Sequence, residues 1–219
     1  MKFQQKHELD EYLKESKYID VTHPKTQIIA TYCLERAKSA MERGDKDAYG
    51  DAEAEVCRQC YLLVRDEIKH SHDINSDKVT FKASDVLSAK EGLCYAKANL
   101  LCALLRANGI PAGIGYQYLR LIENDENSPL VLHAFNFVCL ESAGGWVRLD
   151  ARGNRGLEIR AEFSLEKEKM AFVTDPGLGE IDLPFIFASH DRAVVAKFLM
   201  HDNLTDLWKD LPDKLSGLE

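Results

Sequence analysis

The chain has 219 residues, of which 45% are hydrophobic and 29% charged, proportions typical of a folded globular protein of one domain. Lysine and arginine number 28 against 36 aspartate and glutamate residues, so the net charge is −8. This charge disfavours nucleic acid as a partner, because phosphate backbones attract basic surfaces. The sequence holds no apolar run of 18 residues and opens without the apolar stretch of a secretory signal. We therefore expect no membrane partner and a cytoplasmic location.

In that compartment the cysteines are expected to be reduced thiols. One of them could serve as a nucleophile and two could form a redox or metal pair, while the others would be small buried side chains. The six are Cys33, Cys57, Cys60, Cys94, Cys102 and Cys139.

The first half of the chain predicts helices. Apolar residues recur at helical spacing from Pro24 to about Gly44, and again over about 52–69, before a polar turn at 70–73. The segment 79–81 (VTF) predicts a strand. Ser84 is a plausible N-cap for a short helical turn through Leu87. A strong helix follows from Cys94, with Gly109 as its stop signal.

After Pro111 the hydrophobic pattern changes from helical spacing to one typical of strands. It predicts strands over 113–122, 131–141 and 146–151, with a hairpin turn at 143–145. Helices followed by strands indicate an α+β fold with an antiparallel sheet. Beyond a loop at 152–156 we expect a short helix near 164–170 and a C-terminal helix over about 190–209. We treat the chain as a single domain (1–219), with N-terminal helices (about 1–75), a core (about 79–155) and a C-terminal extension (about 156–219).

Cys94 is the most informative residue, because it opens the long helix directly after Gly92-Leu93. The partial positive charge of a helix N-terminus stabilises a thiolate, and the backbone N–H of Cys94 would point toward an oxyanion beside its sulfur. Gly92 would let a substrate approach the backbone closely. A buried structural thiol is the alternative interpretation.

His133 lies in the middle of an apolar strand, and a buried imidazole needs a polar partner. Asp150 ends the next strand, and side chains on neighbouring antiparallel strands lie roughly 5 Å apart. Asp150 could therefore fix the tautomer of His133 and leave the other ring nitrogen to face Cys94. A core histidine satisfied by a structural aspartate is a credible alternative for the pair alone, and a weaker one once a cysteine at a helix start is considered.

Four blocks of the sequence resemble the transglutaminase-like superfamily, and its bacterial members in particular. They are 92–101 (GLCYAKANLL), 104–112 (LLRANGIPA), 133–136 (HAFN) and 146–150 (WVRLD). The order of the blocks and the gaps between Cys94, His133 and Asp150 also agree. The resemblance covers about 84–155, and is less specific in the helices that precede it.

The resemblance implies a papain-like core, in which the nucleophile helix packs on an antiparallel sheet. It also implies a catalytic triad of Cys94 as nucleophile, His133 as base and Asp150 as orienter. Such an enzyme forms a thioester from a peptide, a protein or a small amide, and transfers the acyl group to water or to an amine. No cofactor and no metal are needed. The superfamily also contains inactive members, so a non-catalytic binding module of the same fold is the alternative.

The second oxyanion donor is left open by the sequence. The hydroxyl of Tyr61 and the side chains of the 70–73 turn are candidates, although core packing is the simpler reading of Tyr61. Arg152 and Arg155 could form the rim of a substrate cleft.

Two further clusters have simpler structural readings. Cys57 and Cys60 form a C-x-x-C motif, which would make a dithiol redox protein the third hypothesis, but their spacing places both thiols on the apolar face of a helix. His70, His72 and Asp73 could bind a metal, although their close spacing is more typical of a solvated helix end.

Overall fold

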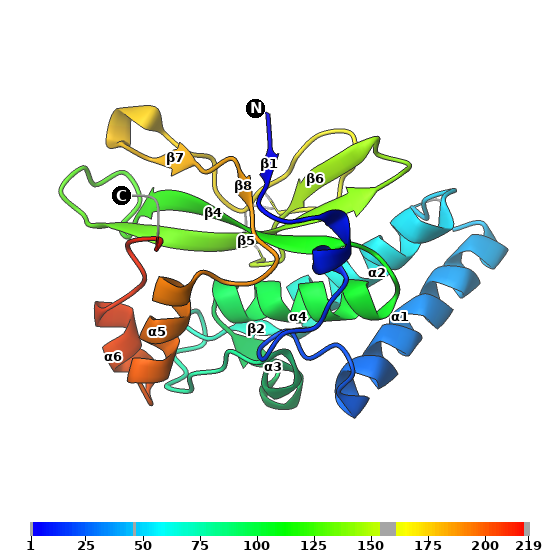
Figure 1. Cartoon of the computed structure of the whole chain (residues 1–219), viewed down its shortest axis with the longest axis horizontal. Coiled ribbons are helices and arrows are strands. Elements are labelled where there is room, and N and C mark those ends of the chain that lie inside the picture. Colours follow the sequence, from blue (N-terminus) through cyan, green and yellow to red (C-terminus); the bar gives the residue numbers. More distant parts are fainter. Residues whose placement is uncertain (1, 46, 154–160, 217–219) are drawn as a thin grey trace.

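The computed structural model describes residues 2–45, 47–153 and 161–216, in which helices pack against one face of a curled antiparallel sheet (Figure 1). This arrangement confirms the α+β fold predicted from the sequence. The helices are α1 (Pro24–Arg43), α2 (Ala52–Glu67), α3 (Ala83–Ala89), α4 (Cys94–Ala107), α5 (Arg192–Met200) and α6 (Leu204–Lys209). The four sheet strands, in spatial order, are β6 (Gly145–Leu149), β5 (Leu130–Leu140), β4 (Ala112–Arg120) and β7 (Ile181–Asp182).

The predicted helices of the first half are present, and their ends carry the expected caps. Pro24 occupies the first turn of α1, and Gly44 ends that helix with φ of +63°. The Asp51 carboxylate caps α2 by accepting a hydrogen bond from the backbone N–H of Ala54 at 2.8 Å.

Helix α4 lies in the centre of the molecule, between the other helices and the sheet (Figure 1), and nearly all of its residues are buried. A helix this apolar on every side is stable only when it is enclosed. Its buried polar side chains donate to backbone carbonyls: Nδ2 of Asn99 donates to Phe81 at 2.9 Å, and the Arg106 guanidinium to Ala112 at 2.6 Å.

The register of the sheet determines which side chains meet above α4. His133 on β5 lies opposite Gln117 on β4, and Asn136 lies opposite Leu149 on β6. The predicted strand over 131–141 is buried on both faces for most of its length, as its continuous apolar pattern indicates.

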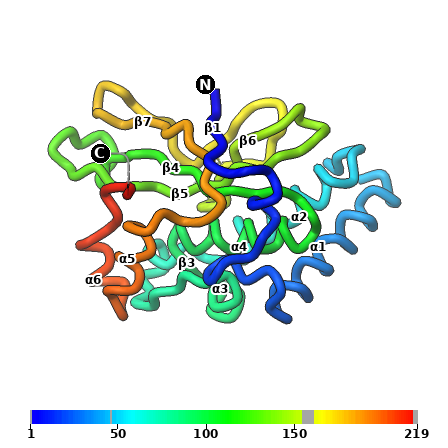
Figure 2. Tube along the Cα trace, viewed as in Figure 1, coloured from blue at the N-terminus to red at the C-terminus, as the bar shows by residue number. Residues whose placement is uncertain are grey.

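Two short parallel pairs complete the fold. Strand β1 (Gln4–Gln5) pairs with β8 (Phe185–Ile186), so the start of the chain lies beside a late segment (Figure 2). Strand β2 (Lys69–His70) pairs with β3 (Glu91–Gly92), directly before α4. The described residues also contain two 3-10 turns, η1 (Leu9–Tyr12) and η2 (Pro176–Leu178).

The segment 79–81 is not a strand, contrary to the prediction. Its polar member Thr80 donates its side-chain hydroxyl to the carbonyl of Glu91 instead of pairing along a ladder. Helix α3 begins one residue before Ser84, and Lys82 occupies the N-cap position. The backbone N–H of Ser84 donates a hydrogen bond to the carboxylate of Asp20, a residue far from it in the sequence, at 3.1 Å.

The extension also differs from the prediction. Residues 164–170 form no helix, and the segment expected to be one helix over 190–209 is divided into α5 and α6. The division follows from Asn203, whose side chain accepts from the backbone N–H of Asp206 and so starts a new helix. Within the described ranges, no helix combines the length and apolar character needed to cross a bilayer.

Candidate active site

Cys94 is the first residue of α4, where the sequence predicts it, and it is 9% exposed. The first backbone N–H groups of a helix have no acceptor within the helix, and they give this end a partial positive charge. The side chain borders a cavity of about 360 Å³, which His133, His70 and Arg152 also line. We refer to this space as the active-site cavity.

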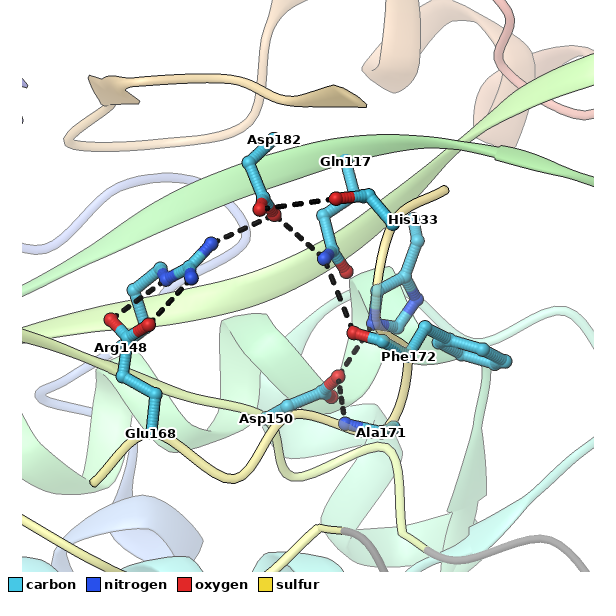
Figure 3. Close-up of polar contacts among 9 residues, drawn as sticks. Gln117, His133, Arg148, Asp150, Glu168, Ala171, Phe172 and Asp182 are labelled. Atoms are coloured by element: carbon cyan, nitrogen blue, oxygen red, sulfur yellow. Dashed lines mark hydrogen bonds and ion pairs between the residues drawn. The ribbon is translucent and has the colours of Figure 1, made fainter. Parts of the chain in front are cut away.

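His133 and Asp150 are in direct contact, as their positions on neighbouring strands suggest. Nε2 of His133 lies 2.8 Å from Oδ2 of Asp150, and both residues are buried (Figure 3). Because Nε2–H donates to the carboxylate, Nδ1 is the ring nitrogen left for Cys94.

The carboxylate of Asp150 is also bound by two backbone amides. Oδ1 accepts from the N–H of Arg152 at 3.0 Å, and Oδ2 accepts from the N–H of Ala171 at 3.1 Å. Burial alone would raise the pKa of Asp150, but the charge of His133 and these hydrogen bonds hold it below its ordinary value. The carboxylate is therefore ionised and fixed in orientation.

The charges of Cys94 and His133 stabilise each other. Burial would raise the pKa of the Cys94 thiol, but the charge of His133 and hydrogen bonds from His133 and His70 lower it. Burial would lower the pKa of His133, but the charges of Asp150 and Cys94 raise it. These opposite shifts favour a thiolate–imidazolium pair near neutral pH, which is the reactive form of a cysteine nucleophile.

A second imidazole, that of His70, approaches Cys94 from the helical layer. The β2–β3 pairing places His70 beside Gly92, two residues before the nucleophile. Its Nδ1 lies 3.5 Å from Oδ1 of Asp73, and that carboxylate receives both terminal nitrogens of Arg152, at 2.7 and 2.8 Å. Of the predicted candidates for a second oxyanion donor, His70 is therefore one that borders the active-site cavity.

Tyr61 and Gly92 have structural contacts instead. The hydroxyl of Tyr61 is fully buried and donates to the backbone carbonyl of Asp150 at 3.1 Å, outside the cavity lining. A Cβ on Gly92 would lie 2.9 Å from Cβ of Ala96 and 3.0 Å from Oγ1 of Thr80. Close packing against Ala96 and Thr80 is therefore enough to require glycine there, and the approach of a substrate to Gly92 stays a prediction.

Lys97 is a buried lysine whose contacts the sequence analysis did not foresee. It is 1% exposed, and its ammonium donates to the backbone carbonyls of Ile68 at 2.5 Å and Arg152 at 3.2 Å. One side chain of α4 thereby joins the segment before His70 to the segment after Asp150. A lysine three residues after Cys94, on a helix otherwise rich in alanine and leucine, was the available signal.

The segment carrying Ala171 is held by a ladder of polar side chains across the sheet (Figure 3). Arg148 on β6 binds the Asp182 carboxylate at 2.7 Å, and Asp182 accepts from the Gln117 amide at 2.7 Å. The same amide nitrogen donates to the carbonyl of Phe172 at 3.4 Å. The ring of Phe172 in turn meets the imidazole of His133 edge-on, with centroids 4.9 Å apart.

The remaining predicted clusters can be placed as well. Cys57 and Cys60 are free, fully buried thiols on α2, and burial raises the pKa of Cys57. In the part of the chain that the structure describes, no group of three or more His, Cys, Asp or Glu side chains is arranged to hold a metal ion. Arg155 lies outside the described residues.

A family model described as the transglutaminase-like superfamily matches residues 35–151 of this chain. Similar solved structures include a candidate cysteine protease from Cytophaga hutchinsonii, with 21% identity and a TM-score of 0.41, covering 66% of this chain and 42% of that one. The periplasmic domain of TgpA from Pseudomonas aeruginosa, bound to ethylmercury, has 18% identity and a TM-score of 0.43, with coverage of 64% and 46%. Red sea bream transglutaminase has 15% identity and a TM-score of 0.41, with coverage of 64% and 27%.

The chain therefore spans less than half the length of each of these structures. No curated protein matches the sequence. The family model, in contrast, covers more than half of the 219 residues, including the segments that carry Cys94, His133 and Asp150. The chain belongs to the transglutaminase-like superfamily, whose usual chemistry is cysteine-based acyl transfer or proteolysis.

Proposed function

We propose that this protein is a cysteine acyl-transfer enzyme that acts on amide or peptide bonds through Cys94, His133 and Asp150. The observation that carries the proposal is the buried His133–Asp150 pair, 2.8 Å apart, beside a cysteine at a helix N-terminus whose thiol pKa is lowered. Burial by itself raises the pKa of a thiol, as it does for Cys102, so the lowered pKa of Cys94 comes from the imidazoles beside it.

In the first step, the Cys94 thiolate adds to the carbonyl carbon and the π electrons move to the oxygen. The C–N bond then breaks as the His133 imidazolium gives its proton to the leaving amine, and a thioester remains on Cys94. In the second step, neutral His133 takes a proton from water or from an acceptor amine, which attacks the thioester. Loss of the thiolate gives a carboxylic acid or a new amide, and His133 is again protonated.

The oxyanion of each tetrahedral intermediate needs hydrogen-bond donors that are fixed before the reaction. We propose the backbone N–H of Cys94 as one donor and His70 as the second. The imidazole of His70 borders the cavity beside Cys94, with its Nδ1 3.5 Å from Oδ1 of Asp73, so a ring N–H of His70 could serve as this donor. The Asp73–Arg152 ion pair, with two bonds of 2.7 and 2.8 Å, keeps Asp73 in this position.

The cytoplasm stays our proposed compartment, because a nucleophilic thiol must remain reduced. Peptides, proteins and small amides are the substrate classes that this chemistry accepts, and the acceptor is either water or a primary amine.

The proposal is tested by acylation kinetics. A p-nitrophenyl ester should release one equivalent of nitrophenol in a rapid burst, and intact-protein mass should locate the acyl group on Cys94. The burst should vanish in Cys94→Ala and persist in the control Cys139→Ala, which removes a partly exposed thiol on β5. Adding a primary amine during turnover separates transamidation from hydrolysis. A burst that survives in folded Cys94→Ala would overturn the assignment.

A further inference from the structure

One wall of the active-site cavity is built almost entirely from apolar side chains. These residues come from the end of β4 and the residue after it, the start of β5, the segment after β6, and α6 with the residues that follow it: Leu119, Leu121, Val131, Phe172, Trp208 and Leu211. The cavity therefore joins a reactive side, with Cys94 and His133, to an apolar side.

The polar side chains on this wall are those of Arg120, Glu123, Tyr95 and His72, and each of them already interacts with other parts of the protein. The guanidinium of Arg120 donates to the carbonyls of Leu178 at 2.8 Å and Ser128 at 2.5 Å. The hydroxyl of Tyr95 donates to the carbonyl of Leu132. The imidazole of His72 stacks on the indole of Trp208, with centroids 3.7 Å apart and planes 15° from parallel. What these residues offer a ligand is mainly apolar contact.

The volume sets the size of the group that fits. An apolar cavity of roughly 150 Å³ holds one benzene molecule. The 360 Å³ beside Cys94 thus accommodate one aromatic ring or branched aliphatic side chain together with its adjoining amide. A polar chain of the same length would lose hydrogen bonds to water against this wall and regain few.

The outer part of the wall belongs to the C-terminal extension, beyond the matched family segment that ends at residue 151. Helix α6 packs below the sheet end where β5 begins (Figure 1), and the N–H of Leu132 donates to the carbonyl of Pro212 at 2.7 Å. The N–H of Leu204 donates to the carbonyl of Asp77 at 2.9 Å. Trp208 and Leu211 are thereby fixed over the cavity.

We propose that the C-terminal extension makes this enzyme selective for amides that carry a large apolar group, aromatic or branched aliphatic, next to the reacting carbonyl. The inference rests on the proposed function, because it assigns the substrate class of the same site. It places selectivity in Trp208, Leu211, Phe172 and Val131, and it disfavours substrates whose side chain ends in a carboxylate or a carboxamide.

Chloroacetamides of the form ClCH₂–CO–NH–R test the cavity without requiring turnover. The Cys94 thiolate displaces chloride, so a C–S bond forms as the C–Cl bond breaks, and R occupies the cavity. Rates of labelling by intact-protein mass, each divided by the rate with glutathione, should be about tenfold higher for R = benzyl than for methyl, 2-carboxyethyl or 2-carbamoylethyl. Tenfold corresponds to about 1.4 kcal/mol.

A matched pair of substitutions provides the control. Val131→Phe fills the cavity and should abolish the benzyl preference, which is expressed for each variant relative to its own rate with the small reagent iodoacetamide. Val173→Phe makes the same change at a position that is 82% exposed, and should keep the preference. If Val131→Phe fails to fold, protection of wild-type Cys94 from iodoacetamide by N-benzylacetamide, but not by N-methylacetamide, gives the same information.

Equal normalised rates for all four R groups, together with no selective protection, would overturn the apolar selectivity. That result is distinguishable from failure of the proposed function, which would appear as the absence of an acyl burst on Cys94. A normal burst without benzyl preference refutes this inference alone.

Discussion

Replacing Asp150 should separate the orientation of His133 from the support of the backbone around it. The carboxylate is 1% exposed and accepts three hydrogen bonds, from Nε2 of His133 and from the backbone N–H groups of Arg152 and Ala171. In Asp150→Ala both buried amides lose their acceptor, at about 1–3 kcal/mol each, or about 2–6 kcal/mol together. Since whole domains are stable by roughly 5–15 kcal/mol, this variant should be close to unfolding.

Asp150→Asn should cost less, because one amide oxygen can replace the more heavily used carboxylate oxygen. Oδ2 serves both His133 and Ala171, whereas Oδ1 serves Arg152 alone. With its oxygen at the Oδ2 position, asparagine preserves the first two bonds and turns its NH₂ group toward the N–H of Arg152. These two facing donors, the asparagine NH₂ group and the N–H of Arg152, then lack an acceptor, which lowers the free energy of unfolding by about 1–3 kcal/mol.

The same variant should also weaken the nucleophile. The negative charge of Asp150 is one cause of the raised pKa of His133, and the positive charge of His133 is one cause of the lowered pKa of Cys94. Removing the first charge therefore lowers the pKa of His133 and raises that of Cys94. The pH profile of iodoacetamide alkylation at Cys94 should shift to higher pH.

Stability should also depend on pH in a defined direction. The pKa of Asp150 is lower in the folded protein, so its contribution is complete above the unfolded value of about 3.9 and is lost as the pH falls through the folded value. In urea unfolding curves from pH 7 to 3, the difference in stability between wild type and Asp150→Asn should therefore shrink as the pH falls below about 3.9. Exposed Asp85→Asn serves as the control. Wild-type stability in Asp150→Ala, or an unshifted alkylation profile in Asp150→Asn, would refute this reasoning.

Three further outcomes are expected. Iodoacetamide at pH 7 should label Cys94 about tenfold faster than Cys139, because the pKa of Cys94 is lowered whereas partial burial raises that of Cys139, although Cys139 is the more exposed of the two. Peptide mapping measures both rates. Cys57→Ala and Cys60→Ser should keep the acyl burst and lower the thermal midpoint, since both positions are fully buried; a stable double variant without a burst would revive a redox role. Lys97→Met should lower the free energy of unfolding by at least about 1–3 kcal/mol, because the carbonyls of Ile68 and Arg152 lose their donor; unchanged urea unfolding would contradict this.

The parts of the fold that the sequence predicts are those governed by a local repeat. Helices α1, α2 and α4 carry apolar residues at helical spacing over three or more turns, and β4 to β6 alternate or run continuously apolar. The contact between His133 and Asp150 also follows, because a short hairpin fixes which strands are neighbours. These inferences need no knowledge of distant contacts.

The features that escape prediction depend on contacts between distant segments. Strand β2 has two residues, too few for a periodic signal, and it forms because Glu91 and Gly92 lie beside it. The ladder from Arg148 through Asp182 to Gln117 joins three strands across the sheet. The irregular course of 161–170 and the break at Asn203 likewise depend on tertiary hydrogen bonds and a side-chain cap rather than on composition.

The charges around the imidazoles of His133 and His70 differ, and this difference explains why we propose different roles for the two residues. The carboxylate of Asp73 is neutralised by two short bonds from Arg152, so it adds little net negative charge beside His70. Asp150 is bound by backbone amides, which carry no net charge, and it therefore acts with its full charge on His133. This difference supports our proposal that His133 accepts a proton from Cys94 and that His70 donates a hydrogen bond. Arg152 joins both units, through its amide to Asp150 and its guanidinium to Asp73, so its displacement would disturb base and oxyanion donor together.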